Sequence, residues 1–124
     1  MDTFTIVRPE HLNHRGSLFG GQLLMWVDEF SWIAAAKEFR CRYLVTRGMD
    51  SIDFKTSVPN GSILRFNILL ARRGKTSVTY RTEVFSDELE GKDETPVFST
   101  HITFVSVDER GRKKELSPIK ETHE

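Results

Sequence analysis

The segment from Gly20 to Ala36 is apolar on almost every side of any helix that it could form. Leucine, methionine, valine, phenylalanine, tryptophan and alanine fill most of its positions, so that no wide polar face remains. A helix of this kind is expected to be buried by the rest of its domain. Asp28 lies in the middle of the segment, and a carboxylate among apolar side chains is costly unless it is paired, hydrogen-bonded or functional. The sequence therefore predicts a central helix that carries a chemically important acid.

The chain after residue 43 has the alternation of strands rather than the periodicity of a helix. Apolar side chains fall mostly on alternate positions, which is the pattern of strands with one buried face. Turn signals at Pro59-Asn60-Gly61 and Arg73-Gly74-Lys75 separate these runs. The expected strands are a short one around Phe4 and Ile6, then segments near 44–54, 63–70, 78–84 and 96–107. We predict an α+β fold in which consecutive strands, joined by short turns, form one antiparallel sheet with a face on the helix.

Length and charge limit the remaining possibilities. The 124 residues are expected to form a single domain, 1–124, with a solvated acidic connection at 86–95 and a poorly ordered tail from about residue 112. Eighteen basic residues balance eighteen acidic ones, which gives no footprint for nucleic acid or an anionic membrane. Asp28 and Glu29 interrupt the apolar segment and argue against a membrane span. The single cysteine, Cys41, and the absence of a visible signal peptide favour a cytoplasmic protein.

A glycine-containing motif covers the start of the predicted helix and reaches the acid. It reads Asn13-x-x-Gly16-x-x-Phe19-Gly20-Gly21, followed after six residues by Asp28-Glu29. This motif resembles the signature of hotdog-fold acyl-CoA thioesterases, in the branch of the cytosolic acyl-CoA hydrolases and their bacterial relatives. The resemblance continues in order through the segments 45–54, 73–77 and 104–108, and so covers nearly the whole chain.

The resemblance implies a fold, an activity and an assembly. The fold is a long helix wrapped by a single antiparallel sheet, and the activity is hydrolysis of an acyl-CoA to the free acid and CoA. Coenzyme A is then part of the substrate, and we expect no separate cofactor. Two subunits of such proteins join their sheets edge to edge and form active sites at their interface, and three dimers often make a hexamer. We therefore expect a homodimer at least, with a trimer of dimers as the larger assembly.

The resemblance places the catalytic carboxylate at Asp28 and a polar amide, Asn13, that reaches the same site from the partner subunit. Asp28 is expected to act as general base for water or as a nucleophile through an anhydride. Gly20 and Gly21 would offer backbone N–H groups to the oxyanion, since helix starts leave such groups unpaired and glycine has no Cβ in the way. Three structural alternatives stay open. Asp28 could be a structural carboxylate that is paired with Lys37, Lys55 or a hydroxyl of the sheet. The glycines could serve the packing of the helix on the sheet, and Asn13 could cap a loop.

Other residues are candidates for holding the substrate. Trp32 lies one turn after Asp28 on the same helix face, where similar proteins usually have a small residue, and we expect it to favour short or compact acyl groups. Phe19 and Met25 are expected to line the same pocket. The CoA phosphates are assigned to Arg73, Gly74, Lys75, Thr76 and Ser77, with the basic run 110–114 as a second candidate.

Two other functions remain possible at this stage. A hotdog dehydratase acting on hydroxyacyl thioesters would use His14 with Asp28, although the chain lacks the proline-rich loop that those enzymes place between the two residues. A non-catalytic acyl-CoA-binding module is the third possibility. The other histidines, His11, His101 and His123, have no metal-ligand spacing, so no metal is expected.

Overall fold

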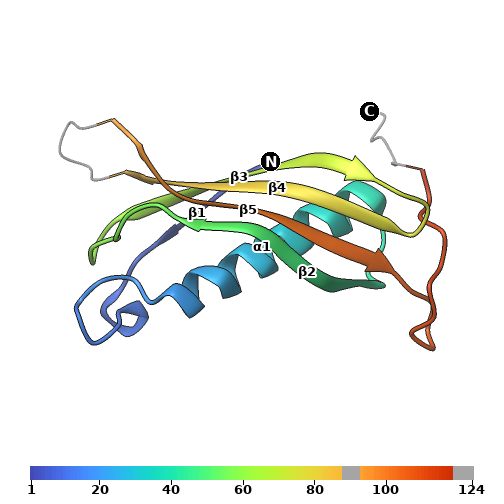
Figure 1. Cartoon of the computed structure of the whole chain (residues 1–124), viewed down its shortest axis with the longest axis horizontal. Helices are drawn as coiled ribbons and strands as arrows, with labels where there is room; N and C mark the ends of the chain where they lie inside the picture. The colour runs from blue at the N-terminus through green and yellow to red at the C-terminus, as the bar shows by residue number, and fades with distance from the viewer. Residues whose placement is uncertain (88–92, 119–124) are drawn as a thin grey trace.

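The structure is a computed structural model that describes residues 1–87 and 93–118. One long helix lies against one face of a five-stranded sheet (Figure 1). The elements are β1 Asp2–Ile6, a short 3-10 helix Pro9–His11, α1 Gly20–Phe39, β2 Leu44–Phe54, β3 Ile63–Arg73, β4 Ser77–Asp87 and β5 Thr95–Ser106. The predicted helix is confirmed, with its start expected near Gly20 or Gly21 and its end expected around Phe39-Arg40. Half of the expected solvated connection at 86–95, residues 88–92, lies outside the described residues, and its ends belong to β4 and β5.

The sheet has the strand order β1-β3-β4-β5-β2, with antiparallel pairing throughout. The expectation that consecutive strands are neighbours is wrong for β2, which pairs with β5 at the far edge and not with β3. The reason is that the segment between β2 and β3 is a crossover and not a hairpin. It passes the N-terminal end of α1, where the carbonyl of Val58 accepts a hydrogen bond from the Leu18 N–H at 2.8 Å. Pro59-Asn60-Gly61 does form a turn, with Gly61 at φ +88°, but within this crossover.

The core lies between one side of α1 and the inner face of the sheet. Along β4, β5 and the first half of β3, alternate residues point toward the helix and are buried, as the sequence predicts, whereas most of β2 is exposed. One polar contact crosses this core: the hydroxyls of Ser31 on α1 and Thr82 on β4 are hydrogen-bonded at 2.7 Å. The helix itself is less covered than expected, since Met25 on its other side is 56% exposed and Ile33 is only partly buried. The largest fully buried side chains include Val27 and Phe39 of α1 and Phe66, Tyr80, Phe98, Ile102 and Phe104 of the sheet.

The expectation of a poorly ordered tail is wrong for residues 112–118. Leu116 is buried, and its N–H donates to the Lys75 carbonyl at 2.8 Å. The Arg73 guanidinium donates to the carbonyls of Leu116 and Ser117, both at 3.3 Å. An apolar anchor and these backbone bonds hold the tail on the β3–β4 turn, and sequence composition does not reveal such contacts. Residues 119–124 lie outside the described residues.

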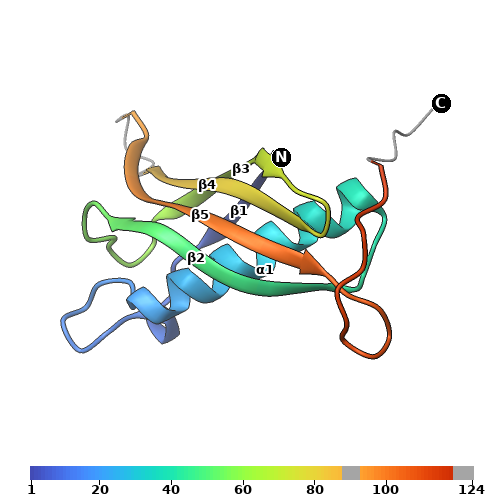
Figure 2. The ribbon, with the colours of Figure 1, turned by 45° about the vertical axis from the view of Figure 1, so that its right-hand side comes forward.

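Figure 2 shows α1 beneath the sheet, with the C-terminal half of the helix near the β3–β4 turn and β2 along one side. In the described part of the chain, no helix is long and apolar enough to cross a membrane.

Candidate active site

Asp28 lies on the side of α1 that faces β2, the edge strand of the sheet. The Thr46 hydroxyl donates a hydrogen bond to Asp28 Oδ1 at 2.6 Å. Thr46 is opposite Phe104 in the β2–β5 ladder, and Phe104 is buried on the helix side, so the threonine hydroxyl points toward α1. Asp28 itself is only partly buried, and within the described residues no further strand pairs with the outer edge of β2. The acid is thus held in place but remains accessible.

Thr46 is the site residue that reasoning from the sequence missed. It belongs to the segment 45–54 that carries part of the family resemblance, but no role is assigned to it there. The signal was available in one of the open alternatives, since a hydroxyl of the sheet was among the proposed partners of Asp28. The lysine partners fit less well: Lys55 is 2.7 Å from the Asp53 carboxylate, and Lys37 lies nine residues further along α1.

A second bond joins the same two elements one turn further on. The Trp32 indole N–H donates to the Leu44 carbonyl at 2.8 Å. Four helix residues advance about 6 Å and two strand residues about 6.6 Å, so the two bonds match in spacing. From the first bond to the second, the residue number rises along the helix, from Asp28 to Trp32, and falls along the strand, from Thr46 to Leu44. The two bonds therefore hold α1 antiparallel to β2. Trp32 therefore shares the side of Asp28, as the sequence predicts.

The glycines form the first turn of α1, with Phe19 as N-cap and no side-chain cap bond. A Cβ on Gly20 would meet the Phe54 ring at 3.5 Å, an ordinary contact, whereas a Cβ on Gly21 would lie 2.6 Å from the Phe19 ring. Gly21 is therefore needed for the position of Phe19, which is itself 56% exposed. Along the axis, seven residues separate Gly21 from Asp28, or about 10 Å. One helix does not bring its own first N–H groups next to its own acid.

Asn13 orders the loop that leads to α1. Its Oδ1 accepts hydrogen bonds from the backbone N–H of Arg15 at 2.8 Å and of Ser17 at 3.2 Å. The alternative that Asn13 caps a loop thus describes the single chain, and a role across a subunit interface stays a prediction. His14 is exposed in the same loop and makes no hydrogen bond with Asp28 within the described residues. The dehydratase arrangement is therefore not assembled within one chain.

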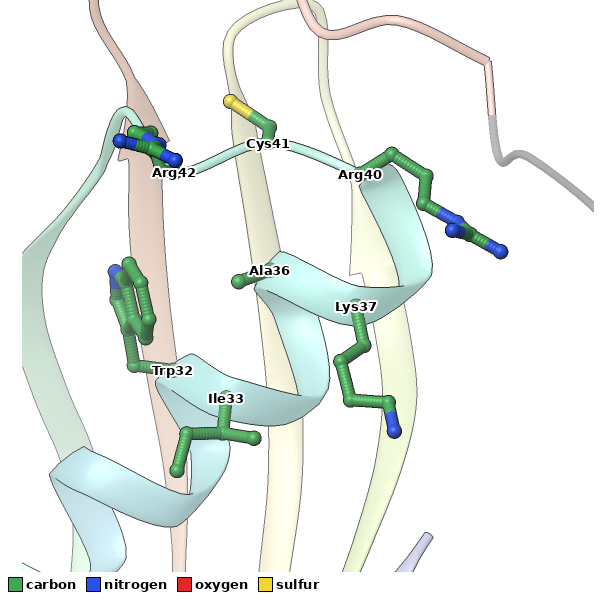
Figure 3. Close-up of a pocket in the computed structure, with 7 residues that line it drawn as sticks. All are labelled: Trp32, Ile33, Ala36, Lys37, Arg40, Cys41 and Arg42. Carbon is green, nitrogen blue, oxygen red and sulfur yellow. The ribbon is translucent and has the colours of Figure 1, made fainter.

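Two cavities lie along α1 on either side of Asp28. The one at the N-terminal end has a volume of about 380 Å³. Its lining residues are Leu18, Gly20, Leu23, Phe54, Lys55, Thr56, Ser57 and Val58. The one at the C-terminal end has a volume of about 690 Å³ (Figure 3). Its lining residues are Trp32, Ile33, Ala36, Lys37, Arg40, Cys41 and Arg42.

The segment from Arg73 to Ser77, predicted to hold CoA phosphates, forms the β3–β4 turn. The Gly74 N–H donates to the Ser77 carbonyl at 2.7 Å, and the Arg73 guanidinium carbon lies 5.2 Å from the centre of the Phe39 ring. Phe39 is the last residue of α1, so this turn lies at the C-terminal end of the helix. Arg73 is engaged by Phe39 and by the tail, and a role in binding phosphate stays a prediction.

No group of three or more metal-ligating side chains comes together within residues 1–87 and 93–118. The expectation that the protein needs no metal is not tested by this observation.

Comparisons with known proteins identify the class to which this fold belongs. A family model described as "Thioesterase superfamily" matches residues 15–91, more than half of the chain. A solved structure of a hexameric hotdog fold thioesterase of Campylobacter jejuni is 30% identical and superposes with a TM-score of 0.83 over 93% of this chain and 88% of that one. The architecture is therefore the hotdog fold, and the chain belongs to the thioesterase superfamily.

Two curated relatives have the same level of identity. "Acyl-coenzyme A thioesterase 11" of Mus musculus is 31% identical over 115 residues, which are 93% of this chain but only 18% of that protein. An uncharacterized acyl-CoA thioester hydrolase of Zymomonas mobilis is 31% identical over 94% of this chain and 78% of its own length. The chain thus spans about a fifth of the mouse relative and most of the bacterial one.

Proposed function

We propose that this protein is an acyl-CoA thioesterase that hydrolyses an acyl-CoA to the free acid and coenzyme A. The observation that carries the proposal is the hydrogen bond between Thr46 and Asp28, which holds a carboxylate at an accessible sheet edge between two cavities. The family supports the reaction class, and the two relatives are named as an acyl-CoA thioesterase and an acyl-CoA thioester hydrolase. The carbonyl of a thioester is already electrophilic, so an acid with a positioned water suffices without a metal.

In the proposed mechanism Asp28 is the base. The bond from Thr46 fixes Oδ1, which leaves Oδ2 to accept a proton from the attacking water. Direct attack by the carboxylate to form an anhydride remains the alternative route. In both routes the carbonyl oxygen acquires negative charge and needs donors about 3 Å away.

We assign those donors to the Gly20 and Gly21 N–H groups of a second copy of the chain. The 10 Å between the first turn of α1 and Asp28 is too long for one carbonyl to contact both within a single helix. A second copy is also expected because apolar side chains are exposed at the start of α1 and along the edge strand β2. They are Phe19, Met25, Val45, Ile52 and Phe54. A similar protein is hexameric, and Asn13 of the second copy would approach the same site.

Short or compact acyl groups are the proposed substrates. A large aromatic side chain lines the cavity on each side of Asp28, Trp32 toward the C-terminal end of α1 and Phe54 toward its N-terminal end. We expect these rings to limit the room for an acyl group. Phe19 and Met25 are exposed near the start of the helix, where a bound substrate or the second copy would cover them.

The decisive experiment is the release of free thiol from a panel of acyl-CoA esters by wild type and by Asp28→Asn. A general base typically contributes about 100- to 10,000-fold in rate, so kcat is expected to fall by that factor with the fold unchanged. Glu29→Gln is the matched control, because Glu29 is the neighbouring acid and is exposed. Undiminished hydrolysis by Asp28→Asn would refute the assignment, and hydration of crotonyl-CoA without thiol release would indicate a hydratase.

A further inference from the structure

The cavity at the C-terminal end of α1 carries positive charge that the site described above does not use. Lys37, Arg40 and Arg42 line it, and none of its lining residues is acidic. Figure 3 shows Arg42 on the same side as Trp32, with Lys37 and Arg40 on the other side and Ala36 between them. Within residues 1–87 and 93–118, neither Lys37 nor Arg42 makes an ion pair. Cations around a concave surface suit a ligand with several negative charges.

The distance from Asp28 to this basic cavity matches one part of the expected substrate. Lys37 lies nine residues beyond Asp28 on α1, or about 14 Å along the axis, and Arg40, the residue that caps the C-terminal end of the helix, lies about 18 Å beyond. An extended chain advances roughly 1.2 Å per bond, so the roughly thirteen bonds from the sulfur of an acyl-CoA to its first phosphorus span about 15 Å. A thioester at Asp28 with its pantetheine arm along α1 therefore places the phosphates at these cations.

We propose that the cavity formed by Lys37, Arg40 and Arg42 binds the phosphate-bearing end of the CoA ester whose thioester lies at the Asp28 of the same chain. This inference rests on the proposed function and adds to it the direction of the substrate. The β3–β4 turn lies at the same end of α1 through the contact of Arg73 with Phe39. The attraction of a helix C-terminus for cations explains a lysine in the last turn but not a cavity of about 690 Å³ beside it.

This direction assigns different parts of the substrate to the two cavities. The pantetheine arm passes Trp32, so the indole affects the position and binding of this arm and does not limit the length of the acyl group. The acyl group then extends toward the N-terminal cavity, where Leu23 and Phe54 provide apolar walls. Phe54, and not Trp32, becomes the residue that restricts acyl length.

The first test is a comparison of two substrates with the same acyl group, hexanoyl-CoA and S-hexanoyl-pantetheine, which lacks the phosphates. Arg42→Gln is expected to raise KM for hexanoyl-CoA about tenfold and to leave KM for the pantetheine ester and kcat for both unchanged. Arg42→Lys should restore most of the affinity. Arg81→Gln is the matched control, because Arg81 lies on the opposite sheet face, between Tyr80 and Thr82, which contact α1. Equal KM changes for both esters, or no change for either, would overturn the proposal.

A third substrate separates two anionic groups that the cavity could recognise. If Arg42 instead binds a carboxylate at the far end of the acyl group, Arg42→Gln should impair the hydrolysis of adipyl-CoA and leave that of hexanoyl-CoA unchanged. That outcome would also overturn the proposal, because it would reverse the direction of the substrate.

Binding provides a readout that does not depend on turnover. Adenosine 3′,5′-bisphosphate, a fragment of the phosphate-bearing end, should bind wild type and Arg81→Gln equally in a calorimetric titration, about tenfold more weakly to Arg42→Gln, and more weakly as salt is raised. Equal affinity for all three proteins would contradict the proposal even where acyl-CoA hydrolysis is intact. Absence of hydrolysis of every acyl-CoA by wild type would instead contradict the proposed function.

Discussion

The Thr46 hydroxyl and the Asp28 carboxylate, 2.6 Å apart, connect the edge strand β2 to the centre of α1. A carboxylate that accepts a bond from a fixed hydroxyl has a defined rotamer and one oxygen left for chemistry. Thr46→Val removes the donor and keeps the β-branched shape, so the fold should be retained. We expect kcat for acyl-CoA hydrolysis to fall about 10- to 100-fold, a loss of about 1.4 to 2.7 kcal/mol of transition-state stabilisation.

Thr46→Ser keeps the hydroxyl and serves as the control for the same measurement. It should retain activity within a few-fold of wild type. Wild-type kcat in Thr46→Val would show that this hydrogen bond has no part in the reaction.

The two helix-start glycines should respond differently to substitution by alanine. In Gly20→Ala the new methyl group meets the Phe54 ring at 3.5 Å without a clash, so only the space in the N-terminal cavity changes. In Gly21→Ala the methyl group would lie 2.6 Å from the Phe19 ring, which must move. Gly20→Ala should keep the wild-type thermal midpoint and assembly, whereas Gly21→Ala should alter the environment of Phe19 in NMR or hydrogen-exchange measurements. Identical behaviour of the two variants would contradict this reading of the helix start.

Acyl-chain preference tests the direction of the substrate. Phe54→Ala enlarges the N-terminal cavity and should shift the best substrate toward longer acyl-CoA esters by several carbons. Trp32→Phe removes the bond to the Leu44 carbonyl but keeps an aromatic ring, so it should raise KM for all chain lengths alike. A chain-length shift in Trp32→Phe and none in Phe54→Ala would place the acyl group at the other end of α1.

Alkaline stability should depend on Tyr80, whose hydroxyl donates to Glu38 Oε1 at 2.5 Å. Burial, and then the hydrogen bond to Glu38 and its negative charge, raise the pKa of Tyr80 above its ordinary value of about 10. The folded chain keeps this proton where the unfolded chain loses it, so the stabilisation is complete below about pH 10 and declines as pH rises further. Urea unfolding from pH 8 to 11 should show a steeper loss of stability for wild type than for Tyr80→Phe. Parallel curves would disagree with this assignment.

Much of the fold could be predicted from local patterns. The apolar run gave the bounds of α1, and the alternation of side chains gave the strands and their inner face. The position of β2 could not be predicted in this way, because the turn signal at Pro59-Asn60-Gly61 is the same in a hairpin and in a crossover. The packed tail was missed for a similar reason, since its anchor, Leu116, is one apolar residue in a basic segment.

The candidate site was predicted in part. The anomaly of an acid in an apolar helix led directly to Asp28, whereas Thr46 is 18 residues away along the chain and only tertiary contact brings it to the acid. The separation between Gly21 and Asp28 follows from helix geometry alone, and it is the ground on which we propose a second copy near the site. The roles of Asn13 and of Arg73–Ser77 stay predictions, because in one chain these residues hold a loop, a turn and the tail.

The bond between Trp32 and the Leu44 carbonyl also bears on how the chain avoids uncontrolled aggregation. The Tyr43 carbonyl accepts a hydrogen bond from the N–H of Val107, the residue that follows β5. The next carbonyl along the strand, that of Leu44, therefore faces outward from the sheet, and it accepts the bond from the Trp32 indole N–H. An incoming strand therefore finds its first acceptor already taken and cannot slide past the beginning of β2. An exposed strand edge can ordinarily pair with further chains and lead to aggregation. Here the bonded Leu44 carbonyl limits where an added strand can pair, and so favours a single register.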